Sequence, residues 1–84
     1  MQNEYAERDL ETLKEILCRL LSQNSIVDNE NIYEAGLTSI MVLPLLAEIE
    51  DTFQLTIPDD DFLDARTPLS LAQMIQRLRN DSTT

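Results

Sequence analysis

Five consecutive residues, Gly36 to Ile40, combine a flexible turn with two hydroxyls at the expected start of a helix. Gly36 is the only glycine in the chain, and glycine adopts a positive φ without strain. Thr38 and Ser39 follow where the loop gives way to a helix, whose first N–H groups and positive dipole end stabilise a phosphate, including one bonded to a serine. Spacing alone leaves a second interpretation open, because Ser and Thr are also common helix caps.

The rest of the sequence offers little other chemistry. The 84 residues contain no His and one Cys, which excludes His-based acid–base catalysis, His/Cys zinc sites and an intramolecular disulfide. Cys18 lies on an apolar stripe without an activating base, so we expect a reduced, small core residue. The acidic run from Asp59 to Asp64 lacks the alternation and glycine of a calcium loop, which favours a solvated helix start. We therefore predict no catalytic residue and no metal site.

Apolar residues recur at helical spacing in the segments that must position Ser39. The predicted helices are about Glu4 to Ser22, Ser39 to Phe53, Asp59 to Asp64 and Pro68 to Asn80, with Thr67 as the cap of the last and Asp81 to Thr84 as a frayed tail. The candidate core residues are Leu10, Leu13, Ile16, Leu17, Leu20, Leu21, Leu45, Leu46, Ile49, Phe53, Phe62, Leu63, Leu71, Ile75 and Leu78.

A long polar loop, Gln23 to Thr38, separates the first two helices. The residues expected to pin it to the helices are Ile26, Val27, Ile32 and Tyr33. These elements predict an all-α, antiparallel bundle of three to four helices, with one domain over residues 1–84 and an ordered core over about 5–80.

Pro44 leaves two starts open for the second helix. If the helix begins near Ser39, Pro44 removes a backbone hydrogen bond to the Ile40 carbonyl and should kink the helix. If regular helix begins near Leu43, Pro44 lies close to the first position, where proline is well tolerated.

Negative charge gathers in the middle of the chain. The net charge is −10, with 6 Lys and Arg against 16 Asp and Glu. No Lys or Arg lies between Arg19 and Arg66, while ten acids do: Asp28, Glu30, Glu34, Glu48, Glu50, Asp51, Asp59, Asp60, Asp61 and Asp64. Such a surface repels nucleic acid and attracts basic proteins, although solubility alone also accounts for surface charge. Neither a secretory signal nor a membrane span is recognisable, so we expect a cytoplasmic monomer.

The segment Glu34-Ala35-Gly36-Leu37-Thr38-Ser39-Ile40, followed by Leu45 to Phe53 and then Ile57-Pro58-Asp59, resembles the acyl and peptidyl carrier protein family. The resemblance extends from Leu10 to Leu78. In that family the serine of a Gly-Leu-Asp-Ser-Leu-like motif receives the 4′-phosphopantetheine arm of coenzyme A. The resemblance therefore implies that Ser39 bears this cofactor, with Gly36, Leu37, Thr38 and Ile40 around it, and it implies the family's helical bundle.

Two departures from the family pattern concern partner recognition. Thr38 replaces the Asp that commonly precedes the serine, which removes a carboxylate beside the arm. Met41 and Pro44 stand where fatty acid carriers usually have acids, so we expect an apolar docking surface at Met41 and Pro44, rimmed by Glu48 and Asp51. These departures favour carriers of specialised acyl or aminoacyl groups.

The resemblance implies a free-standing carrier without catalytic activity, whose phosphopantetheine thiol holds an acyl or aminoacyl group as a thioester. The implied partners are a phosphopantetheinyl transferase, a loading ligase or acyltransferase, and downstream biosynthetic enzymes. An alternative from another class is a small acidic helical adaptor or inhibitor that binds a basic protein and is never modified.

Overall fold

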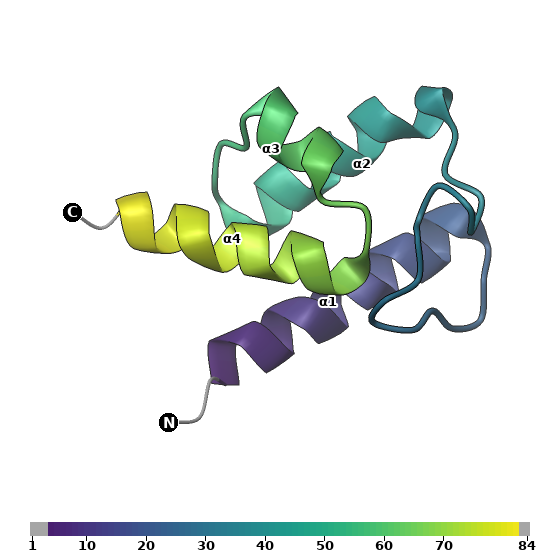
Figure 1. Cartoon of the computed structure of the whole chain (residues 1–84), viewed down its shortest axis with the longest axis horizontal. Helices are drawn as coiled ribbons and strands as arrows, with labels where there is room; N and C mark the ends of the chain where they lie inside the picture. The colour runs from purple at the N-terminus through teal and green to yellow at the C-terminus, as the bar shows by residue number, and fades with distance from the viewer. Residues whose placement is uncertain (1–3, 83–84) are drawn as a thin grey trace.

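Four helices make up most of the chain in the computed structural model, which describes residues 4–82 (Figure 1). They are α1 (Glu4–Leu21), α2 (Ser39–Phe53), α3 (Asp59–Asp64) and α4 (Pro68–Ser82). Figure 1 shows α2 and α4 running opposite to α1, with the short α3 between them in sequence. This confirms the predicted all-α bundle and its long loop. None of the described helices is both long and apolar enough to cross a membrane.

The last helix shows how local sequence signals set its start. The Ser70 N–H donates to Thr67 Oγ1 at 3.1 Å, so Thr67 caps α4 as predicted, and Pro68 takes the first helical position. The far end differs from the prediction, because α4 continues to Ser82. The predicted tail from Asp81 is therefore helical for two residues, and residues 83–84 lie outside the described part of the chain.

The core fills the space between the facing sides of the helices. Its most deeply buried apolar side chains, each at most 1% exposed, are Leu13, Leu17, Ile32, Leu45, Ile49, Phe62, Leu71 and Ile75. Two predictions of inward-facing residues are wrong, since Leu63 and Val27 are exposed. The six-residue α3 turns Phe62 inward and its neighbour outward. Cys18 and Phe53 are half-buried at the edge of the core.

The long loop before α2 is tied to both α1 and α4. Its Ile32 N–H donates to the Arg66 carbonyl at 2.8 Å, and its Asp28 carbonyl accepts from the Leu69 N–H at 3.0 Å. The Asp28 carboxylate also pairs with Lys14 of α1. The buried side chain of Ile32 adds an apolar anchor beneath these polar contacts. A loop held in this way can present the start of α2 in a fixed position.

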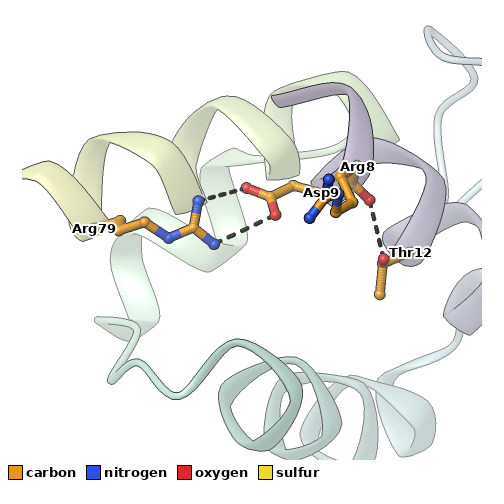
Figure 2. A network of polar contacts seen from close by, with 4 residues as sticks. All are labelled: Arg8, Asp9, Thr12 and Arg79. Carbon is orange, nitrogen blue, oxygen red and sulfur yellow. Dashed lines mark hydrogen bonds and ion pairs between the residues drawn. The ribbon is translucent and has the colours of Figure 1, made fainter. Parts of the chain in front are cut away.

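An ion pair joins α1 and α4 near the two ends of the chain (Figure 2). Arg79 Nη1 lies 2.8 Å from Asp9 Oδ2, and Nη2 lies 3.3 Å from Oδ1, so the contact is bidentate. The Asp9 side chain is 7% exposed and that of Arg79 is 33% exposed. Because Asp9 is nearly buried, its carboxylate depends on this guanidinium to replace lost hydration.

The Asp9–Arg79 pair should contribute measurably to stability. We expect Arg79→Gln to lower the free energy of unfolding by about 2 kcal/mol, less than for a fully buried pair because Arg79 is partly hydrated. Asp9→Asn should cost less, since the released guanidinium can turn toward water. Urea denaturation measures both changes.

Arg77→Gln is the matched control. Arg77 pairs with Asp61 at 3.6 Å, and both side chains are more than a third exposed. Its removal should cost no more than about 0.5 kcal/mol. Equal losses for Arg79→Gln and Arg77→Gln would contradict a special role for the buried pair.

The contact between Lys14 and the loop makes a prediction for high pH. The hydrogen bond to the Asp28 carboxylate raises the pKa of Lys14 above its ordinary value near 10.5. Because the folded state holds this proton more tightly, its stabilisation is full below the ordinary pKa and is lost as pH rises through the folded pKa. We expect the Tm difference between wild type and Lys14→Gln to be constant from about pH 7 to about pH 9 and to shrink above the Lys14 pKa.

Arg19→Gln serves as the control for this pH series. Arg19 of α1 pairs with Glu48 of α2, and a guanidinium stays protonated throughout this range. Its Tm difference from wild type should not converge with rising pH. If the Tm difference between wild type and Lys14→Gln also stays constant as pH rises, the Lys14 ammonium does not stabilise the loop.

Candidate functional site

Ser39 is the first residue of α2, and its side chain is exposed. The preceding Thr38 has extended backbone angles, φ −107° and ψ 168°, and occupies the cap position without a side-chain cap hydrogen bond. The Ser39 hydroxyl likewise has no hydrogen-bond partner in the described part of the chain. Neither hydroxyl therefore serves as a helix cap. This excludes the capping interpretation that the sequence spacing had left open. Ser39 is therefore accessible from solvent at the start of α2.

The turn before Ser39 requires glycine at position 36. Gly36 has φ +126°, a region in which residues with a side chain are strained. A Cβ added there would meet only Leu21 Cδ2, at an ordinary 4.0 Å, so the backbone angle and not crowding is the constraint. Directly after the turn, the Leu37 side chain is buried and its N–H donates to the Ile32 carbonyl at 3.0 Å. Leu37 thus anchors the loop one step before the hydroxyls emerge.

The start of α2 suits a negatively charged group on Ser39. The first N–H groups of a helix have no partner within it, and the helix dipole is positive at that end. The Met41 N–H donates to the Thr38 carbonyl at 2.9 Å, which leaves those of Ser39 and Ile40 to the surroundings. The first turn of α2 contains no acid that would repel an anion. These residues fit a phosphate ester at Ser39 Oγ.

Pro44 lies inside α2, so the first of the two helix starts considered above is correct. Because proline has no N–H, the Ile40 carbonyl receives no helical hydrogen bond from it. Pro44 is itself exposed, which lets water reach this part of the helix. The helix continues from Pro44 to Phe53 with Leu45, Leu46 and Ile49 buried.

The exposed side of α2 carries an apolar strip, defined as Ile40, Leu43, Pro44 and Ala47. These residues follow the i, i+3, i+4, i+7 spacing of one helix face. The side chains of Ile40 and Leu43 are 84% and 71% exposed. The strip begins beside Ser39 and points to water along two turns.

The position expected for Met41 needs correction. Met41 is half-buried and packs against the core instead of lying on the outer surface. Pro44 and Asp51 are exposed as expected. Glu48 is half-buried and pairs with Arg19 of α1, so its carboxylate is already engaged within the chain. The structure therefore brings Pro44 and Asp51 to the outer side of α2 and turns Met41 inward.

Sequence reasoning missed Leu43 and Ala47, although a signal was present. Both lie at helical spacing from Ile40, and Leu43 falls outside the face that Leu45, Leu46 and Ile49 define. The sequence did not decide where the helix begins. If it began near Leu43, Ile40 would lie outside the helix and would not share a helical face with Leu43 and Ala47. Fixing the start at Ser39 makes the strip continuous.

Comparison with known proteins agrees with this geometry. Residues 11–75 match the family described as phosphopantetheine attachment site. The chain is also 36% identical over 78 residues to the hybrid PKS-NRPS synthetase pynA of Aspergillus niger. That alignment covers 88% of this chain and 2% of the synthetase, so the chain spans a small fraction of its relative's length.

Members of the family carry covalently attached 4′-phosphopantetheine and work with a phosphopantetheinyl transferase and biosynthetic enzymes. The match extends over most of the chain, from within α1 to within α4, and so includes the loop, the glycine turn and the start of α2. The resemblance noted from the motif is confirmed: this chain belongs to the phosphopantetheine attachment site family of carrier domains.

Proposed function

We propose that Ser39 is the attachment residue for 4′-phosphopantetheine. The observation that carries this proposal is the exposed Ser39 hydroxyl, which has no partner in the described chain and stands at a helix start without acids. In the transfer, Ser39 Oγ attacks the pantetheine-bearing phosphorus of coenzyme A. A new P–O bond forms, the bond to the 3′,5′-ADP half breaks, and the hydroxyl proton passes to a base of the transferase.

The proposed role is that of a carrier and cosubstrate. The thiol of the bound arm holds an acyl or aminoacyl group as a thioester, while this chain supplies attachment and orientation. No His is present to act as a base, and Cys18 is half-buried. The chemical steps on the cargo therefore belong to partner enzymes.

We propose further that the carrier serves specialised biosynthesis. The likeness to a hybrid PKS-NRPS synthetase supports a specialised cargo, as does the apolar strip where acids would suit a fatty acid carrier. The partners are then a transferase, a loading ligase or acyltransferase, and downstream enzymes. Brief docking suits this role, since one carrier must visit several enzymes.

The attachment residue can be tested by intact mass. Incubation with coenzyme A, magnesium and a broad-specificity phosphopantetheinyl transferase should raise the mass by one phosphopantetheine group. Ser39→Ala should show no increase because the attacking oxygen is gone.

Thr38→Ala is the control, since it removes the neighbouring hydroxyl and leaves Ser39 intact. It should be loaded like the wild type. If a folded Ser39→Ala protein is still loaded, Ser39 is not the attachment residue. The same conclusion follows if Thr38→Ala abolishes loading while Ser39→Ala does not. Absence of loading in the wild type would favour an unmodified acidic adaptor.

The apolar strip is the proposed docking surface, together with Asp51 one turn further along α2. Leu43→Glu places a charge in its centre, and we expect kcat/KM for Ser39 loading by the transferase to fall about tenfold. Because Leu43 is 71% exposed, the free energy of unfolding should stay within about 0.5 kcal/mol of the wild type.

Val27→Glu is the matched control, an exposed apolar residue of the loop that lies outside the strip. Its kcat/KM should remain within about twofold of the wild type. Equal effects of the two substitutions would indicate a general consequence of added negative charge and would count against the strip. Met41→Glu is unsuitable here, because Met41 packs against the core.

A further inference from the structure

A surface groove lies between the loop before α2 and the end of α3. Its lining residues are Asn31, Tyr33, Glu34, Leu63 and Arg66. The hydrogen bond from the Ile32 N–H to the Arg66 carbonyl joins its two walls. The side chain of Leu63 is 49% exposed, so the groove offers apolar surface beside polar groups. Figure 1 shows the loop and the α3–α4 connection at the same end of the bundle as the start of α2.

Arg66 gives this groove an unusual charge. Four of the six cations of the chain pair with carboxylates: Lys14, Arg19, Arg77 and Arg79. Arg66 is the only cation between Arg19 and Arg77, in the most acidic part of the sequence, yet its guanidinium has no ion-pair partner within the described residues. Even Glu34, which lines the same groove, forms no ion pair with it. An unpaired guanidinium is a ready partner for a planar carboxylate.

The amide of Asn31 adds a second hydrogen-bonding group. Asn31 Oδ1 accepts from the N–H groups of Tyr33 and Glu34, at 2.9 and 3.2 Å, which fixes the orientation of the side chain. Its NH₂ group is left to donate elsewhere. Arg66 and Asn31 together supply N–H donors, while Leu63 and the Tyr33 ring supply apolar contact. This combination suits a short carbon chain that ends in a carboxylate.

The spacing along the chain between Ser39 and the groove is comparable to the length of the phosphopantetheine arm. Ser39 follows Glu34 by five positions, and the segment between them turns sharply where the Gly36 N–H donates to the Tyr33 carbonyl at 3.3 Å. An extended phosphopantetheine arm matches a peptide of four to five residues, about 15 Å. The arm can therefore fold back along its own loop, and its tether gives the cargo an effective concentration in the millimolar range. An acidic partner protein would instead bring many negative charges against a chain of net charge −10, whereas the cargo brings a single carboxylate.

We propose that this groove receives the acyl end of the arm on Ser39 and that Arg66 selects cargo bearing a terminal carboxylate. The inference rests on the proposed function, because the cargo reaches the groove only from Ser39. Arg66 acts here as a specificity-determining residue. The neutral end of a simple alkyl chain gains apolar contact with Leu63 but leaves the guanidinium unpaired.

The test compares two cargoes of equal chain length by NMR. ¹⁵N-labelled protein is loaded from stable amide analogues of glutaryl-coenzyme A and pentanoyl-coenzyme A, and intact mass verifies each sample. We expect the Arg66 side-chain Nε–H and the Leu63 and Tyr33 backbone amides to shift with glutaryl and to shift much less with pentanoyl. Arg66→Gln should remove the difference, and Arg77→Gln should retain it.

Each alternative result overturns the inference in a recognisable way. Identical spectra for the two loaded forms would show that Arg66 does not select a carboxylate. A third sample carries phosphopantetheine without an acyl group. If the Arg66 Nε–H signal shifts as far in this sample as in the glutaryl-loaded protein, Arg66 interacts with the phosphate of the arm and not with the cargo. Failure of the mass increase would overturn the proposed function itself, and this inference with it.

Discussion

The hydrogen bond between the Ile32 N–H and the Arg66 carbonyl connects two segments that belong to no helix. Ile32 is fully buried, so the loop is held there by both a polar and an apolar contact. Four residues later comes the positive φ of Gly36, then the buried Leu37, then the exposed hydroxyls. The presentation of Ser39 depends on this anchor, because a loop free to move would not hold one hydroxyl at the helix start.

Ion pairs between helices stabilise the bundle, while other charged side chains remain unpaired on its surface. Arg19 pairs with Glu48 across α1 and α2, and Arg79 pairs with Asp9 across α4 and α1. The exposed acids Asp51, Asp59 and Asp60 lie outside these pairs. Their long-range attraction for a basic enzyme surface costs little stability, since surface charges are well hydrated. Arg66 is the exception within this acidic part of the molecule.

Local signals were sufficient for most of the fold. The periodic leucines and the Thr67 cap follow from rules that act over a few residues, whereas Pro44 left the start of α2 open between Ser39 and Leu43. The side that each outer residue faces required tertiary information. Met41 turned inward because α2 runs unbroken through Pro44, a choice that depends on how water and neighbouring helices accommodate the lost hydrogen bond. The groove at Arg66 joins residues more than thirty positions apart, which no local pattern could reveal.

The stability of the bundle and the proposed docking surface have different physical sources. The Asp9–Arg79 pair joins the first half of α1 to the last half of α4, and Figure 1 shows the beginning of α1 and the end of α4 at the opposite end of the bundle from the start of α2. The buried side of α2 supplies Leu45, Leu46 and Ile49, so the core takes nothing from the strip on its outer side. Leaving the large apolar side chains of the strip in water brings no gain in folding free energy. Contact with a partner at this proposed docking surface would give them a favourable burial that the folded chain alone does not provide.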